Sequence, residues 1–199
     1  MSVKKIAKDD FAVFVDGLIG KTRVIGVQAK GDRFDFGPLE SAKDLRLDYD
    51  VTLQPPKKYF LPPKEVLMTF EMGGAYQSQY EDEPFVLLGV HPYDLVAINQ
   101  MDELFRQDNY DTHYMKRRNN ATIVACDVAQ PSENVFASSM GTAVVKEGYD
   151  VLLTDVGDAY VAESGTPKGE KLLAEMKGAT ADEAALKSRD AVWAKNKKG

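Results

Sequence analysis

The chain has 199 residues, of which 44% are hydrophobic and 28% are charged, so it can bury the core of one domain of ordinary size. The formal net charge of −6 disfavours a nucleic-acid binder, which needs a basic face to neutralise phosphates. No run of about 18 apolar residues could insert into a membrane, no apolar core follows the charged N-terminus as in a signal peptide, and one cysteine cannot form an intrachain disulfide. These features predict a cytoplasmic protein.

The N-terminal quarter carries a helix signal and then a hairpin signal. Residues 5–19 place apolar side chains at helical spacing, which predicts an amphipathic helix that ends near Gly20. Residues 22–30 and 33–36 are typical of strands and are joined by a Gly-Asp turn, so they predict a β-hairpin. Ser41 can cap a single helical turn after them.

Two proline pairs mark the stretch 54–64. Proline lacks an amide donor and restricts the residue before it, so we expect an extended, ordered loop. The residues between the proline pairs are Lys57, Lys58, Tyr59 and Phe60. They could contact a cofactor, a cluster or a partner subunit, or the segment could be a stiff connector whose rings pack on the core. The polar residues 73–83 that follow predict an exposed loop or hairpin tip.

The clearest unit is a strand, a turn and a helix. Residues 84–90 form an apolar run typical of a buried strand, and a helical pattern opens at Asp94, which is predicted to be the N-cap. A second apolar strand at 121–126 predicts a βαβ-like crossover. Ligands bind beyond the carboxyl ends of such strands, so the turn at 91–94 is the best generic site. His91 itself is interpreted as a hydrogen-bonded structural residue rather than a catalytic one.

The C-terminal part begins with an irregular connection over residues 127–148. A hairpin is predicted over 151–162, a helix over 167–176, and a last helix that starts from a capping box at 180–183 and runs through Trp193. Together the elements predict a single α/β domain, with a mixed sheet, flanking helices and long irregular loops.

Few residues qualify as metal ligands or nucleophiles. His91, His113 and Cys126 are the only imidazoles and thiol, and no Cys-x-x-Cys, phosphate-binding loop or serine-nucleophile motif is present. No metal site and no catalytic residue are therefore predicted. Residues 113–118 suggest a short helix, whose Arg117 and Arg118 could bind an anionic group or form a solvated helix end.

Several blocks of sequence, spread from about residue 41 to about residue 175, together resemble the N-terminal domain of a known family. This family contains the sulfhydrogenase beta chains and the A-type chains of anaerobic sulfite reductase, which are iron–sulfur electron-transfer proteins. The blocks are the proline phrase at 55–63, His91–Leu95, His113-Tyr114 with Arg117-Arg118, Cys126-Asp127, Ser139–Thr142 and Leu152–Asp158. Their order and number make the resemblance specific, whereas one block alone would be weak.

The resemblance implies a lost cluster. Members of the family carry cysteines at the positions of Tyr93, Cys126, Val135 and Ala137, which would supply the four thiolates of a [4Fe–4S] cluster. Three of these are replaced here, so we expect no conventional cluster in this domain. The family continues into a ferredoxin-like module, so residues 1–178 would be the α/β domain, and 179–199 a C-terminal helix and basic tail that could link to such a module.

The resemblance further implies a non-catalytic accessory subunit of an anaerobic redox complex of the hydrogenase or sulfite reductase kind. Such a protein would dock other subunits, among them flavin- or ferredoxin-type proteins. The predicted cofactor or partner surface consists of Lys57, Lys58, Tyr59, Phe60, His91, Tyr93, Asp94, Arg117, Arg118, Ser139 and Met140. An alternative is an oxidoreductase subunit that binds a flavin or a nucleotide through His91, Tyr93, Arg117 and Arg118. A hydrolase or transferase has the least support, because no nucleophile–base pair is evident.

Overall fold

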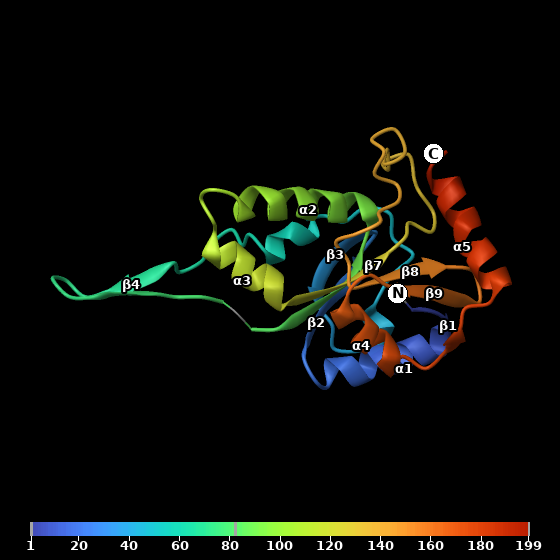
Figure 1. The fold of residues 1–199 in the computed structure, drawn as a ribbon, viewed down its shortest axis with the longest axis horizontal. Coiled ribbons are helices and arrows are strands. Elements are labelled where there is room, and N and C mark those ends of the chain that lie inside the picture. The colour runs from blue at the N-terminus through green and yellow to red at the C-terminus, as the bar shows by residue number, and fades with distance from the viewer. Residues whose placement is uncertain (1, 82, 199) are drawn as a thin grey trace.

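Within residues 2–81 and 83–198, the part of the chain that this computed structural model describes, eight strands form one mixed sheet (Figure 1). Their order is β10-β1-β9-β8-β7-β6-β2-β3. The strands are β1 (Val3–Ala7), β2 (Arg23–Lys30), β3 (Arg33–Pro38), β6 (Phe85–Val90), β7 (Ala121–Cys126), β8 (Val151–Asp155), β9 (Ala159–Ser164) and β10 (Ala179–Thr180). The helices are α1 (Lys8–Ile19), α2 (Pro92–Arg106), α3 (Thr112–Asn120), α4 (Pro167–Glu175) and α5 (Glu183–Asn196), with 3-10 turns η1 (Ala42–Asp44) and η2 (Pro56–Tyr59). The predicted α/β fold with a mixed sheet and flanking helices is confirmed.

The centre of the sheet is parallel and buried on both faces. Strands β2, β6, β7 and β8 run parallel, and α2 and α3 connect β6 to β7, which confirms the predicted crossover. Alternate residues of β6 enter two separate cores. Leu87 packs in the core that α2 and α3 cover, whereas Val86 and Leu88 pack in the core that α1 and α4 cover. The predicted hairpins β2–β3 and β8–β9 are also present.

The first strand of the sheet was not expected from local periodicity. Residues 3–7 form β1 and pair with β9 from Val3↔Glu163 to Ala7↔Ala159, so the predicted helix begins at Lys8 rather than near residue 5. The pairing partner lies more than 150 residues away, and a pattern of nearby side chains cannot reveal it. The predicted end of α1 is confirmed, because Gly20 is its C-cap.

Three further local predictions were wrong. The proline stretch is not fully extended but contains η2, because the fixed φ of Pro56 suits the first position of a helical turn. Asp94 is not the N-cap of α2, which begins at Pro92 with His91 as its cap residue. Thr180 does not cap α5 but pairs with β1, and the capping carboxylate is Asp182, which accepts a bond from the Ala185 amide at 2.8 Å.

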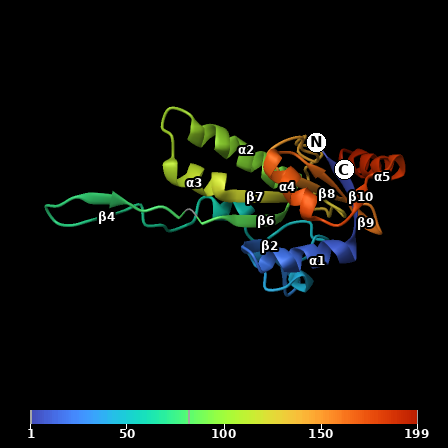
Figure 2. The same ribbon diagram turned by 60° about the horizontal axis from the view of Figure 1, so that its bottom comes forward.

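A long hairpin leaves the body of the molecule between η2 and β6. Its strands β4 (Met68–Phe70) and β5 (Tyr76–Ser78) pair antiparallel and form a sheet of their own. Both views show the hairpin projecting away from the main sheet and its helices (Figures 1 and 2). Of the exposed loop or hairpin tip predicted over 73–83, residues 73–75 lie at its end, residues 76–78 form β5, and residue 82 lies outside the described residues. We call residues 66–81 the arm.

None of the helices in the described part of the chain is both long enough and apolar enough to span a bilayer.

Candidate functional site

Five of the eleven predicted surface residues line one of two hollows in the structure: Tyr93 and Met140 line the first, and Lys57, Lys58 and Tyr59 line the second. The first is an apolar cavity of about 180 Å³ between the start of α2 and the long connection that follows β7. Its lining consists of Val51, Tyr93, Asn134, Val135, Phe136, Ala137, Met140 and Thr142. The other is a groove of about 710 Å³ at the root of the arm, which we call the arm groove. Its lining consists of Arg23, Gln54, Pro55, Lys57, Lys58, Tyr59, Leu61, Pro62, Pro63, Glu81 and Met101.

His91 is fully buried just before the first turn of α2 and contacts two other segments of the chain. Its Nδ1 lies 2.7 Å from the carbonyl oxygen of Cys126, and its Nε2 lies 3.1 Å from that of Tyr49. The imidazole also stacks on the Tyr49 ring, with the ring centres 3.9 Å apart. Burial lowers the pKa of His91 from 6.5 to about 4, so the ring is neutral at pH 7. It therefore joins the ends of β6 and β7 to the loop before η2.

Tyr93 stands at the wall of the apolar cavity and fastens two loops together. Its hydroxyl donates to the carbonyl oxygen of Asp50, and burial raises the pKa of Tyr93, so the hydroxyl remains a donor. The Asp50 carboxylate accepts a bond from Ser132 in the connection after β7. The cavity wall is thus built by hydrogen bonds that hold the backbone of both loops in place.

The connection after β7 supplies the exposed side of this cavity. Ser139 donates to the carbonyl oxygen of Phe136 at 2.8 Å and shapes the turn. Phe136 and Met140 are 69% and 66% exposed, although both are large apolar side chains. The predicted pair Ser139 and Met140 therefore has two roles, with one residue ordering the loop and the other offering an apolar surface.

Cys126 does not face the apolar cavity. Its side chain is buried in the core that includes α1 and α4, and its Sγ lies 3.3 Å from the carbonyl oxygen of Asp127. Burial raises the pKa of the thiol, so it is neither a nucleophile nor a ready metal ligand. Among the described residues, no group of three or more His, Cys, Asp or Glu side chains could hold a metal ion.

Asp94 lies in the first turn of α2, within electrostatic reach of the arm groove. Burial raises the pKa of its carboxyl from 3.8 to about 7, while the positive charge of Lys57 opposes that rise. The carboxyl can therefore exchange a proton near neutral pH.

At the arm root the predicted residues differ in accessibility. Lys57, Lys58 and Tyr59 line the groove, whereas Phe60 is fully buried and packs against Phe85 and Tyr114. Lys58 is also bonded to Asp35, at 3.0 Å. The η2 turn thus exposes Lys57, while Tyr59 is half-buried with its hydroxyl bonded to the Phe36 carbonyl oxygen at 2.9 Å and Phe60 anchors the turn in the core.

Arg117 and Arg118 lie inside the structure rather than on a free basic patch. Arg117 is buried and donates from Nε to the carbonyl oxygen of Phe60 at 2.8 Å and from Nη1 to Glu65. Arg118 donates to Asp102 at 2.8 Å, and Asp102 also accepts the Tyr114 hydroxyl at 2.6 Å. Both arginines hold the η2 and α2 segments in place, and they do not point toward one shared cavity.

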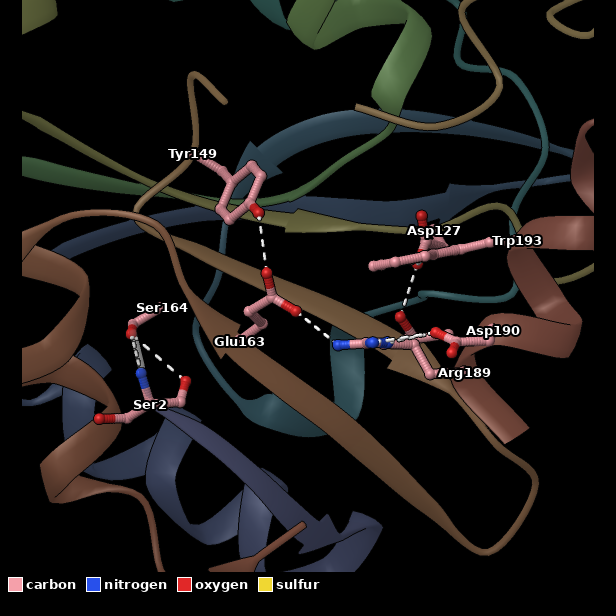
Figure 3. Close-up of polar contacts among 9 residues, drawn as sticks. Ser2, Asp127, Tyr149, Glu163, Ser164, Arg189, Asp190 and Trp193 are labelled. Carbon is pink, nitrogen blue, oxygen red and sulfur yellow. Dashed lines mark hydrogen bonds and ion pairs between the residues drawn. The ribbon is translucent and has the colours of Figure 1, made fainter. Parts of the chain in front are cut away.

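A buried polar network was missed by sequence reasoning. Asp127 follows β7 directly, and its Oδ2 accepts bonds from Thr154 at 2.6 Å and from the indole of Trp193 at 2.7 Å. Beside it, Figure 3 shows Glu163 between Tyr149 and Arg189, with the Arg189 bond at 2.6 Å. These contacts fasten α5 to the sheet. A carboxylate directly after a buried strand was the available signal, but its partner Trp193 lies 66 residues away.

Burial raises the pKa of Asp127 from 3.8 to about 6, despite the two donors on Oδ2. The folded state therefore binds the Asp127 proton more tightly than the unfolded state. This contribution to stability is complete below about pH 3.8 and is lost as the pH rises through about 6.

Asp127→Asn is expected to keep the acceptor for Thr154 and Trp193 while removing the buried charge. As the pH rises from 4 to 7, the free energy of unfolding of the variant should increase by about 1–3 kcal/mol relative to that of the wild type, since one pKa unit corresponds to about 1.4 kcal/mol. Denaturant unfolding at a series of pH values measures this. The matched control is Asp190→Asn on the exposed side of α5, which should show no such pH-dependent gain. A constant difference between wild type and Asp127→Asn would contradict the assignment.

Comparison with known proteins places these features in context. No family model matches the chain, and no solved structure matches it. The chain is 30% identical over 175 residues to Sulfhydrogenase 2 subunit beta of Pyrococcus furiosus. The match covers 88% of this chain and 52% of that relative, so the chain spans about half the length of the curated protein it matches. This similarity supports the relation to the family that the sequence blocks indicate.

Proposed function

We propose that this chain is an accessory subunit of a redox complex of the hydrogenase type, which docks other subunits and holds no [4Fe–4S] cluster of its own. The similarity to a sulfhydrogenase beta subunit over most of the chain supports the first part. Electron-transfer complexes of this kind in anaerobic metabolism would place the chain in the cytoplasm, with flavin- or ferredoxin-type proteins among its neighbours.

The observation that carries the proposal is the convergence of three separate positions on one cavity. Tyr93 comes from the first turn of α2, and Val135 and Ala137 come from the connection after β7, yet all three line the apolar cavity. These are the positions at which the resembling family has cysteines. The ligands of a cofactor must lie close together around one site, as these three positions do. The side chains found at them are mainly apolar.

The residues present do not fit an iron–sulfur cluster. Phenol, isopropyl and methyl groups stand where thiolates would be needed, and valine and alanine offer no donor atom. The remaining thiol, Cys126, is buried in the other core and is directed toward backbone carbonyls. Three of the four positions therefore lie together at one cavity, and the side chains found there cannot bind iron.

Exposed apolar side chains at the same place support a docking role. Phe136 and Met140 border the apolar cavity, and Val51 and Leu53 extend the apolar surface along the neighbouring loop. Large exposed apolar side chains that gather at one place are typical of protein interaction surfaces. We assign the partner-binding role to this surface and to the arm groove with Lys57, Lys58 and Tyr59.

No single observation favours the flavin- or nucleotide-binding alternative. It requires His91, Tyr93, Arg117 and Arg118 to face one ligand. His91 is buried between two carbonyl groups, and both arginines are bonded within the structure, while Tyr93 faces the apolar cavity.

Iron and acid-labile sulfide content tests the proposal. The wild-type protein, purified without oxygen and then incubated with iron and sulfide, is expected to contain neither in stoichiometric amount and to lack broad visible absorbance. Stoichiometric iron and sulfide in the wild type would overturn the cluster-free assignment.

A cysteine-restored variant supplies the matched comparison. The triple variant Tyr93→Cys, Val135→Cys and Ala137→Cys is expected to gain iron and visible absorbance under the same treatment in the presence of a small thiol, because the three side chains line one cavity and the small thiol supplies the fourth ligand that the buried Cys126 does not. Circular dichroism verifies that the variant is folded. A folded triple variant that binds no more iron than the wild type would contradict the shared site.

A further inference from the structure

The arm has one polar face and one apolar face. Its strands pair Met68 with Ser78 and Phe70 with Tyr76, and side chains alternate between faces, so these four residues share one face. The other face carries Thr69 and polar residues of β5, with a bond from Gln79 to Thr69 at 3.1 Å. This two-faced pattern is typical of a strand pair that is covered on one side.

Nothing in the described part of the chain covers the apolar face. Phe70 is 69% exposed, Tyr76 is 74% exposed, and Met72 at the tip is 96% exposed. A two-stranded hairpin is at best marginally stable in water unless its apolar face packs against something. The views in Figures 1 and 2 agree that the arm extends into solvent, away from both cores. A partner surface is therefore needed to explain its composition.

Charge restricts what that surface can be. Between residues 66 and 81 the chain carries Glu71 and Glu81 and no lysine, arginine or histidine. Such a segment is repelled by anionic lipid headgroups and by nucleic acid. It suits an apolar protein groove that has cations at its rim.

The arm groove of the same fold has that chemistry. Leu61, Pro62, Pro63 and Met101 give it apolar walls, and Arg23 and Lys57 add positive charge. Neither of these two cations has an ion-pair partner among the described residues. From the arm of the same chain only Glu81, at its root, lines the groove. The groove of one copy is thus free to receive the arm of another.

We propose that two copies of this chain exchange arms about a two-fold axis, with the tip of each arm seated in the arm groove of the other. In this arrangement the two arms lie antiparallel, and Phe70 and Met72 of one copy approach the groove residue Leu61 of the other copy. The contact is self-complementary, since each copy offers the same arm and the same groove. About seven residues per strand give a reach of about 23 Å, which suffices to span from one arm root to the next.

The exchange accounts for the interface area that one arm could not supply. A stable, specific interface buries about 1,600 Å² in total. A single arm presents a narrow surface, but exchange adds arm–arm contact and two filled grooves. Dimer formation does not depend on whether the chain binds iron. A test that finds no dimer therefore refutes the arm exchange without bearing on the proposed function.

Disulfide trapping between two variants with one added cysteine each tests the geometry directly. Native Cys126 is buried and does not interfere. One variant carries Met72→Cys at the arm tip and the other Leu61→Cys in the groove. After mixing and mild oxidation, we expect a cross-linked species of twice the 22.0 kDa chain mass that joins one copy of each variant. The control replaces Leu61→Cys by Val13→Cys, which is exposed on α1, and should not cross-link.

Sedimentation or light scattering of the purified chain measures the association itself. The wild type is expected to be a dimer at micromolar concentration, and Phe70→Ser with Tyr76→Ser should raise its dissociation constant at least tenfold. Thr69→Ser with Gln77→Ser, on the polar face, is the matched control and should leave the constant unchanged. A monomeric wild type, or a dimer that the apolar-face variant does not weaken, overturns the proposal. Cross-linking of Met72→Cys to Val13→Cys as readily as to Leu61→Cys does so too.

Discussion

Alanine at position 169 is expected to lower the stability of the protein more than any other single methyl group added to the fold. A Cβ at Gly169 would lie 1.7 Å from the carbonyl oxygen of Asp150 and 2.5 Å from its carbonyl carbon. These are backbone atoms of the residue just before β8, and they cannot rotate away as a side chain can. The first turn of α4 lies directly against them, with the Gly169 amide bonded to Thr166 at 3.0 Å.

The strand that would have to move is itself tightly held. The Asp150 amide donates to the carbonyl oxygen of Ile123 at 2.9 Å, and its carboxylate accepts the Ile123 amide at 2.8 Å. Displacing Asp150 therefore disturbs the link between β7 and β8 as well. We expect the free energy of unfolding to decrease by at least about 3 kcal/mol, which is at the upper end of the effects of single substitutions.

Thermal unfolding measures this loss, which corresponds to a decrease in Tm of about 10 °C for a chain of this size. Gly17→Ala is the matched control, because Gly17 lies inside α1 and a Cβ there meets nothing within 4 Å. That variant should be more stable than the wild type by about 0.5–1 kcal/mol, since alanine favours a helix. If both variants unfolded at the same temperature, the close approach of α4 to β8 would be refuted.

His91→Ala is expected to lower the stability of the protein by a similar amount. The substitution removes a buried ring that stacks on Tyr49 and leaves the carbonyl oxygens of Cys126 and Tyr49 without it. The cavity and the lost hydrogen bond together should cost about 3–5 kcal/mol. His113→Ala is the control, because that half-buried ring has only one long bond, of 3.3 Å, to the Leu67 carbonyl oxygen and a contact with the Tyr80 ring, and should cost about 1 kcal/mol.

The pH dependence of the His91 effect has a defined sign. The folded pKa of about 4 lies below the ordinary value of 6.5, so the unfolded chain takes up the proton first. The wild type should therefore lose stability as the pH falls from about 6.5 to about 4, and His91→Ala should lack this loss. Urea unfolding from about pH 8 to about pH 4 measures the free energies of unfolding of the two proteins, and the difference between them should become smaller as the pH falls. A difference in the free energy of unfolding that does not change with pH would show that His91 is not buried in its neutral form.

Packing gives a simple explanation for a cysteine at position 126. The thiol fills a place in the core beside Val124 and Leu153, and its raised pKa keeps it protonated. A small buried cysteine behaves as an apolar side chain. Its presence alone is therefore not a sign of metal binding.

Much of the framework was determined by the sequence itself. The apolar runs at 84–90 and 121–126, separated by a helical pattern, predicted parallel buried strands and the crossover between them. The Gly-Asp turn after residue 30 predicted the β2–β3 hairpin. These predictions succeed because strand alternation, helical period and turn chemistry are local properties, which neighbouring residues reveal.

Only the tertiary structure decided which of these elements and side chains meet. Val3–Ala7 became a strand because β9 offers it an edge, and Asp127 became a buried carboxylate because Trp193 reaches it from α5. Arg117 was predicted as part of a surface and lies under η2, bonded to Phe60. Tyr93, Val135 and Ala137 share one cavity although about 40 residues separate the first from the others. Contacts of this kind join distant parts of the chain, and they depend on the summed packing of the whole fold rather than on any local pattern.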